Sequence, residues 1–117
     1  MTKLIEKKCN NCEKDAVALS CEDILAYLKQ INKEWLLDDT QNIINRRFYF
    51  PIYSQTIAFV NAVAWIAVKE GQYPEMKIGY GYCDIKFTTN AIAALTENDF
   101  ICAAKIDHLI AEESDYV

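Results

Sequence analysis

The chain has 117 residues, of which 52% are hydrophobic and 25% charged, with only three glycines and two prolines. This length fits one domain with its own core, and the composition excludes a disordered, collagen-like or linker-dominated chain. The net charge of −5 argues against direct binding to nucleic acid or to an anionic membrane surface. The charged N-terminal residues do not resemble a signal peptide, and no apolar run reaches the ~18 residues of a membrane span. We therefore expect a cytoplasmic protein.

The five cysteines are expected to be reduced, because an odd number without an export signal does not suggest a disulfide framework. Cys9-x-x-Cys12 has the spacing of a zinc or redox motif, but no second cysteine pair or histidine pair accompanies it. Cys21 and His108 could complete a metal site only by coincidence of folding. No metal site is predicted, and a zinc or disulfide role for Cys9 and Cys12 stays open.

Residues 1–19 are polar and lack periodicity, so we expect a loosely packed arm. The first helix is predicted to begin at Ser20, because Ser20 and Asp23 form a capping pattern that satisfies free backbone N–H groups. Apolar side chains then recur at helical spacing as far as about residue 32. These side chains are Ile24, Leu25, Leu28 and Ile31.

The remaining sequence predicts four strands and two further helices. Strands are expected where hydrophobic and polar residues alternate or short apolar runs lie between turns, at 35–37, 44–50, 76–82 and 83–89. A long core helix from 52 to 69 is predicted because Pro51 suits a helix entry and Gly71 suits a left-handed helix end. A third helix begins at Thr96, because Thr96 and Asp99 repeat the capping pattern.

The element order α-β-β-α-β-β-α indicates the fold class. Two pairs of antiparallel strands separated by one long helix are typical of an α+β domain. We predict a four-stranded antiparallel sheet with three helices packed on one face, formed by residues 20–112 as a single domain. The polar arm at 1–19 precedes this domain, and an acidic tail at 113–117 follows it.

Taken one by one, the residues offer little catalytic chemistry. His108 is the only histidine, which excludes a site with two histidine ligands or paired imidazoles. Its place in the last helix is typical of a solvated side chain. No glycine-rich phosphate loop or nucleophile elbow is present. Asp38 and Asp39 are adjacent in a turn, where carboxylates are usually solvated.

The stretch 70–90, followed by 95–99, resembles the signature region of the pterin-4a-carbinolamine dehydratases. In that family a His-His-Pro loop precedes an aromatic residue, a strand that ends in Thr-His, and a helix that starts Leu-[Ser/Thr]-x-x-Asp. The residues that match this pattern without gaps are Pro74, Tyr80, Thr89, Leu95 and Asp99. The resemblance covers roughly residues 4–112 and implies the same α+β fold as the element order.

Three departures fall at the catalytic positions of that family. The two loop histidines correspond to Gln72 and Tyr73, and the strand-end histidine corresponds to Asn90. Amides do not titrate, and a phenol with an ordinary pKa near 10 is a poor base at neutral pH. We expect these three residues to converge on one pocket that lacks a group titrating near pH 7. Substrate contacts are assigned by the resemblance to Pro74, Thr88, Thr89 and Asn98.

The resemblance implies two alternative functions. The first is a hydro-lyase that dehydrates 4a-hydroxytetrahydrobiopterin in tetrahydrobiopterin recycling, with the pterin as substrate and no further cofactor. The second is a non-catalytic relative that binds a pterin or a protein partner, similar to the branch of the family that acts as a dimerisation cofactor. Family members are dimers and tetramers, and a four-stranded sheet has edges that proteins usually pair or cover. A homodimer or homotetramer is therefore expected.

Overall fold

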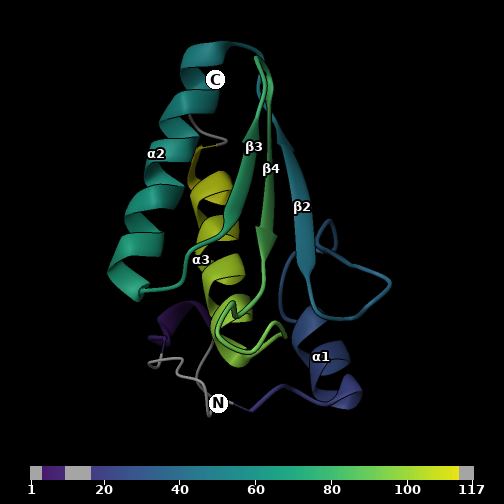
Figure 1. Cartoon of the computed structure of the whole chain (residues 1–117). Coiled ribbons are helices and arrows are strands. Elements are labelled where there is room, and N and C mark those ends of the chain that lie inside the picture. Colours follow the sequence, from purple (N-terminus) through teal and green to yellow (C-terminus); the bar gives the residue numbers. More distant parts are fainter. Residues whose placement is uncertain (1–3, 10–16, 114–117) are drawn as a thin grey trace.

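The structure is a computed structural model that describes residues 4–9 and 17–113, with side chains as far as residue 110 (Figure 1). One antiparallel sheet has the strand order β1-β2-β4-β3. The strands are β1 (Leu36–Leu37), β2 (Ile44–Tyr49), β3 (Glu75–Ile78) and β4 (Tyr82–Phe87). The helices are a short 3-10 turn η1 (Leu4–Glu6), then α1 (Cys21–Leu28), α2 (Tyr53–Glu70) and α3 (Glu97–Glu113). The predicted α+β fold, with a four-stranded antiparallel sheet and its helices on one face, is confirmed.

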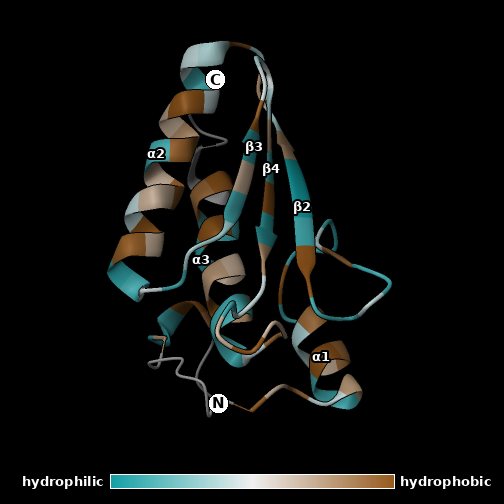
Figure 2. Ribbon diagram, viewed as in Figure 1, coloured by the Kyte–Doolittle hydropathy of each residue, from teal (hydrophilic) through white to brown (hydrophobic). Residues whose placement is uncertain are grey.

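The core lies between the sheet and the helices. Alternate residues of the two central strands point into it, and β2 and β4 pair so that Ile44 lies opposite Phe87 and Phe48 opposite Cys83. The α2 helix contributes the fully buried Phe59 and Val63. The α3 helix, which contacts η1, α1 and α2, is rich in hydrophobic residues (Figure 2). Each such large side chain stabilises the fold by about 1.5–3 kcal/mol when it is fully buried.

The opposite face of the sheet is polar and open. Arg47 and Asp84 are register partners on β2 and β4 and form a two-point ion pair, with N–O distances of 2.6 and 2.8 Å. The hydrogen bond from Arg47 lowers the pKa of Asp84. This charged face explains why the helices cover only one side of the sheet.

The N-terminal segment packs more closely than predicted. Leu4 is only 4% exposed and joins the core, and Lys7 Nζ lies 2.7 Å from the Glu97 carboxylate at the start of α3. The expectation of a loosely packed arm is therefore wrong for residues 4–9. Two adjacent apolar residues, Leu4 and Ile5, among polar ones produce no periodicity, so the sequence pattern did not reveal this contact. Residues 1–3 and 10–16 of the arm, which include Cys12, and residues 114–117 of the acidic tail lie outside the described residues.

Several element boundaries also differ from the prediction. The α1 helix ends at Leu28 rather than near residue 32, and β3 ends at Ile78 because a glycine turn follows. A Cβ atom on Gly81 would lie 2.7 Å from the carbonyl oxygen of Phe50, so only glycine fits there. Tyr80 lies in this turn and is 67% exposed, rather than part of a strand. Among the described residues, no helix combines the length and hydrophobicity needed to cross a membrane.

Candidate functional site

The candidate site lies where the loop after α2 meets the end of β4, in the lower half of Figure 1. Gly71 ends α2 with a left-handed backbone (φ 70°), and its N–H group donates to the Ala67 carbonyl. This reversal directs Gln72 and Tyr73 toward the segment that follows β4. Glycine adopts this conformation at little cost, so the helix end predicted from the sequence is also what forms one wall of the site.

Two adjoining pockets bring most of the predicted site residues together. A cavity of about 130 Å³ is lined by Gln72, Tyr73, Thr88, Thr89 and Asn90, together with Gly71 and Ala91. A second cavity of about 280 Å³ shares three of these residues and adds Pro74, with Glu75, Lys86 and Ile43 around it. The three positions of the family histidines therefore face one small region of the surface.

Asn98 is the predicted site residue that lies apart from this group. It is buried, at 4% exposure, in the first turn of α3, and it lines neither of the two cavities. Its backbone carbonyl accepts a hydrogen bond from Cys9 Sγ at 3.6 Å. The structure thus places Asn98 among contacts of the N-terminal segment.

Behind the smaller cavity, Gln72 is held by a buried carboxylate. Its side chain is only 5% exposed, and its Nε2 atom donates to Asp99 Oδ1 at 2.5 Å. The second carboxylate oxygen, Oδ2, accepts from Thr89 Oγ1 at 2.9 Å and from the Thr96 backbone N–H group at 3.0 Å. Gln72 therefore presents to the cavity a side chain whose amide nitrogen is already engaged.

Asp99 is a titratable group that the sequence analysis assigned to a helix cap and to the family signature. Burial of this fully enclosed side chain raises its pKa to about 6, although hydrogen bonds from Thr96, Thr89 and Gln72 favour the charged form. A carboxyl group with this raised pKa thus lies directly behind the pocket, although it lines neither cavity. The signal available in the sequence was the capping pattern, and Asp99 does accept the Thr96 N–H group. Nothing local to that pattern indicates complete burial.

At the exposed family positions, Tyr73 and Asn90, the site offers hydrogen-bonding groups, and the charged side chains of Glu75 and Lys86 lie at the wall of the larger cavity. Tyr73 is 59% exposed, Asn90 is exposed, and the hydroxyl of Thr88 donates to the Asn42 carbonyl at 2.7 Å. A phenol and an amide can orient a flat polar ring by hydrogen bonds. Asp99 has no exposed surface, so it can influence a ligand only through Gln72 or Thr89.

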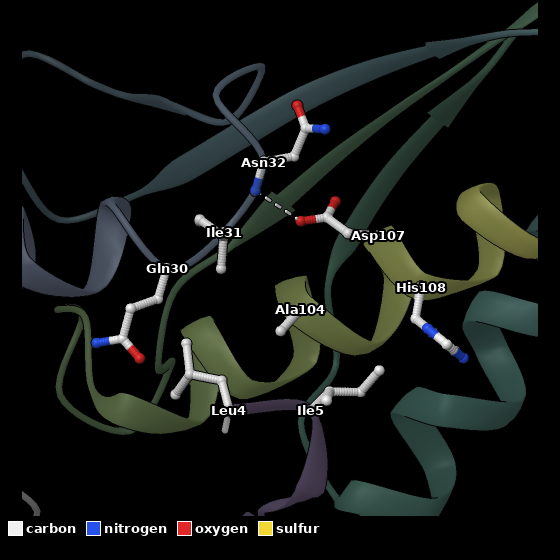
Figure 3. Close-up of a pocket in the computed structure, with 8 residues that line it drawn as sticks. All are labelled: Leu4, Ile5, Gln30, Ile31, Asn32, Ala104, Asp107 and His108. Atoms are coloured by element: carbon white, nitrogen blue, oxygen red, sulfur yellow. Dashed lines mark hydrogen bonds between the residues drawn. The ribbon is translucent and has the colours of Figure 1, made fainter. Parts of the chain in front are cut away.

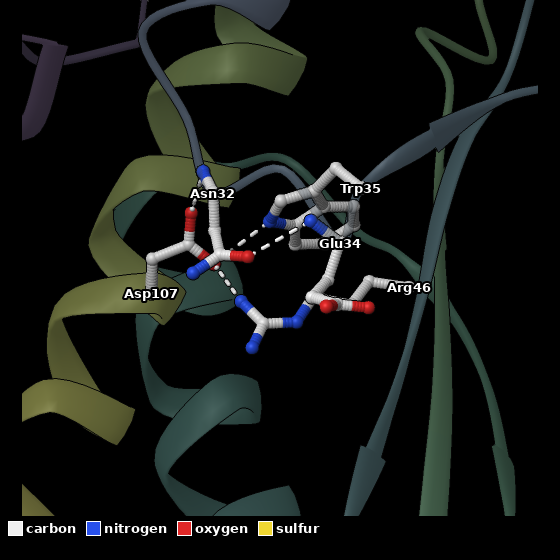
Figure 4. Close-up of polar contacts among 5 residues, drawn as sticks. All are labelled: Asn32, Glu34, Trp35, Arg46 and Asp107. Carbon is white, nitrogen blue, oxygen red and sulfur yellow. Dashed lines mark hydrogen bonds and ion pairs between the residues drawn. The ribbon is translucent and has the colours of Figure 1, made fainter.

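A larger hollow of about 590 Å³ lies elsewhere, between η1, the loop after α1, and α3 (Figure 3). Its most polar wall residue, Asp107, accepts hydrogen bonds from the Asn32 N–H group at 2.9 Å and from Trp35 Nε1 and Arg46 at 2.7 Å each (Figure 4). Burial raises the pKa of Asp107. Because these donors occupy the carboxylate, the network serves to fasten the β1 region to α3, and we do not assign a ligand to this hollow.

The remaining sequence candidates are dispersed. His108 and Cys21 are exposed, and the Cys21 thiol donates to Gln41 Oε1. Asp38 organises its turn by accepting hydrogen bonds from Thr40 and from backbone N–H groups, which lowers its pKa. Within the described part of the chain, no three histidine, cysteine or acidic side chains gather where they could hold a metal ion.

Comparisons with known proteins agree on one family. The family model for pterin 4 alpha carbinolamine dehydratase matches residues 17–109. A relative from Legionella pneumophila (strain Lens), provisionally named as a pterin-4-alpha-carbinolamine dehydratase, is 46% identical over 93% of this chain and 96% of its own length. A relative with the same provisional name from Nitrosomonas eutropha is 48% identical over 92% of this chain and 93% of its own length.

Two solved structures share the fold. A transcriptional coactivator/pterin dehydratase from Brucella melitensis superposes with a TM-score of 0.75 at 25% identity, covering 80% of this chain and 98% of that one. A pterin dehydratase-like protein, identified as a RuBisCO assembly factor in the α-carboxysome, has a TM-score of 0.57 at 30% identity over 65% of this chain and 88% of its own. Since the family model spans most of the chain and the relatives align along nearly all of it, the chain belongs to the pterin-4-alpha-carbinolamine dehydratase family.

Proposed function

We propose that this chain binds 4a-hydroxytetrahydrobiopterin between Tyr73 and Asn90 and dehydrates it slowly. The observation that carries the proposal is the convergence of Gln72, Tyr73 and Asn90, the positions of the family histidines, on one small region beside Pro74 and Thr88. The pterin is the substrate in this proposal, and no further cofactor is invoked.

The expected rate follows from the groups at these positions. Dehydration must move a proton from a ring nitrogen and help the hydroxyl group leave as water. Tyr73 can donate a hydrogen bond to that hydroxyl group, whereas Asn90 can only orient the ring. General acid–base catalysis is typically worth about 10²–10⁴-fold, so the absence of three imidazoles predicts a correspondingly low rate.

The direct test is a stopped assay of 4a-hydroxypterin dehydration with the purified protein, compared with the uncatalysed rate. We expect a small acceleration without a bell-shaped pH profile between pH 6 and 8. A rate equal to that of histidine-containing family enzymes would refute our interpretation of the three substitutions.

Restoring the imidazoles sharpens the test. The triple variant Gln72→His, Tyr73→His, Asn90→His should raise the dehydration rate by about 10²-fold or more. Tyr49→His is a matched control, because Tyr49 is 75% exposed on the open face of the sheet and should leave the rate unchanged. A folded triple variant without any gain would refute catalysis at this pocket.

The second candidate function is a non-catalytic relative that binds a pterin or a protein partner. It is supported by the absence of imidazoles at all three family positions and by the solved relative described as an assembly factor. Calorimetry with 7,8-dihydrobiopterin separates the two functions when combined with the assay. If the wild type and the triple variant both bind the pterin without turnover, a pterin-binding role is supported. If neither binding nor turnover is found, a protein partner is supported.

A further inference from the structure

Two cysteine thiols that are far apart in the sequence lie side by side. Cys9 follows η1 and Cys102 lies on α3, and their Sγ atoms are 3.6 Å apart across 93 residues of sequence separation. Cys102 is fully buried, whereas Cys9 is partly exposed. Both are free thiols in this structure. The spacing of Cys9 and Cys12 drew attention to a local pair, but the fold supplies Cys9 with a different neighbour.

The position of Cys9 is defined by contacts of its backbone and of its thiol. Its backbone N–H group donates to Glu70 Oε1, at the end of α2, at 2.9 Å. Its thiol also lies 3.6 Å from the Asn98 carbonyl, one helical turn before Cys102. Nearby, Lys105 Nζ donates to the Ile5 carbonyl at 2.8 Å. These contacts hold the segment against α3, so the approach of the two sulfurs belongs to the packing of this region.

We propose that Cys9 and Cys102 form a reversible disulfide that fastens the N-terminal segment to α3 under oxidising conditions. A disulfide bond is about 2.05 Å long, so the two sulfurs need to approach by about 1.5 Å. A segment that precedes the domain and joins it through side-chain contacts can make such a movement more easily than two packed helices. The inference holds whether or not the pocket binds a pterin.

The reaction balances with a low-molecular-weight disulfide as the oxidant. The Cys9 thiolate attacks one sulfur of oxidised glutathione, which forms a mixed disulfide and releases one glutathione thiolate. The Cys102 thiolate then attacks the Cys9 sulfur, which forms the protein disulfide and releases the second glutathione thiolate. The two thiol protons end on the two glutathione molecules, and the protein loses two electrons.

The two thiols differ in a way that sets this order. The hydrogen bond with Cys9, together with burial, raises the pKa of the Cys102 thiol. Because the thiolate is the nucleophile, Cys102 reacts poorly with a reagent in solution, and the partly exposed Cys9 reacts first. Cys83 is not a competitor, because it is fully enclosed in the sheet and burial raises its pKa to about 11.

The test is oxidation of the full purified chain with oxidised glutathione, followed by peptide mapping without reduction. We expect a crosslinked Cys9–Cys102 peptide in the wild type and also in Cys12→Ser, which removes the local alternative. Because the bond closes a long loop, oxidation should raise Tm by about 5–15 °C in both proteins. Cys102→Ala should show no such rise, and its reduced form reports whether the substitution itself changes Tm.

Three results would overturn the proposal. One is a Cys9–Cys12 bridge as the main product in the wild type. Another is glutathione retained on Cys9 without a protein disulfide. The third is a Cys9–Cys102 bond that leaves Tm unchanged, since the crosslink would then not fasten the segment. Restoration of the original Tm by a reducing agent is the expected sign of reversibility.

Discussion

Replacing Asp99 with asparagine should remove a specific pH dependence of stability. In the folded chain, burial raises the pKa of this carboxyl group from its ordinary value of 3.8 to about 6. The folded state therefore binds more protons than the unfolded state between these two values. Stability from this group is fully present below about pH 4 and is lost as the pH rises through 6.

The magnitude follows from the size of the shift. A change of roughly two pKa units, at about 1.36 kcal/mol per unit, corresponds to about 3 kcal/mol in the free energy of unfolding. Asp99→Asn is nearly isosteric and stays neutral at every pH. Its amide can still accept from Thr96, and Gln72 can meet it by rotating its own amide. The free energy of unfolding of the variant, measured relative to that of wild type, should therefore increase by about 3 kcal/mol when the pH is raised from 3.5 to 7.

Urea unfolding of both proteins at a series of pH values measures this difference directly. Taking the difference cancels the contributions of other titrating groups, such as Asp107. Asp84→Asn provides a control of opposite sign, because Arg47 lowers the pKa of Asp84 and wild type should gain stability over that variant as the pH rises. The reasoning would be refuted if the difference in free energy of unfolding between wild type and Asp99→Asn did not change with pH. It would also be refuted if that difference shifted in favour of wild type at higher pH.

Three further predictions concern stability and assembly. Gly71→Ala should destabilise the fold by about 1 kcal/mol in urea unfolding, because its φ of 70° is costly for other residues although its surroundings are open; an unchanged midpoint would contradict this. Asp107→Ala should cost about 3 kcal/mol or more, since it leaves the mostly buried Arg46 without its ion-pair partner, and Asp107→Asn should cost less because it keeps an acceptor. Light scattering at tens of micromolar protein should give at least twice the chain mass of 13.4 kDa. Trp65 and Val68 expose apolar surface on α2, and β3 lies at an edge of the sheet, so both features favour association. A monomeric mass would contradict this prediction.

The sequence alone determined the three α-helices, the four strands and their order, because the signals for them are local. The hydroxyl of Ser20 accepts the Asp23 N–H group at 3.2 Å, as the capping pattern predicted, and Gly71 takes the left-handed conformation expected at a helix end. Alternation of hydrophobic and polar residues also identified the two central strands. These features depend on residues a few positions apart, so a single sequence carries them in full. The resemblance to the family added the positions of the site.

Only the tertiary structure decided what surrounds these residues. Asp99 has the same capping pattern in the sequence whether it is solvated or enclosed, and its raised pKa depends on burial by segments distant along the chain. The contact between Cys9 and Cys102, and the burial of Leu4, likewise join the start of the chain to its last helix. Desolvation and long-range packing depend on which segments meet in space, and periodicity within one segment does not encode that information.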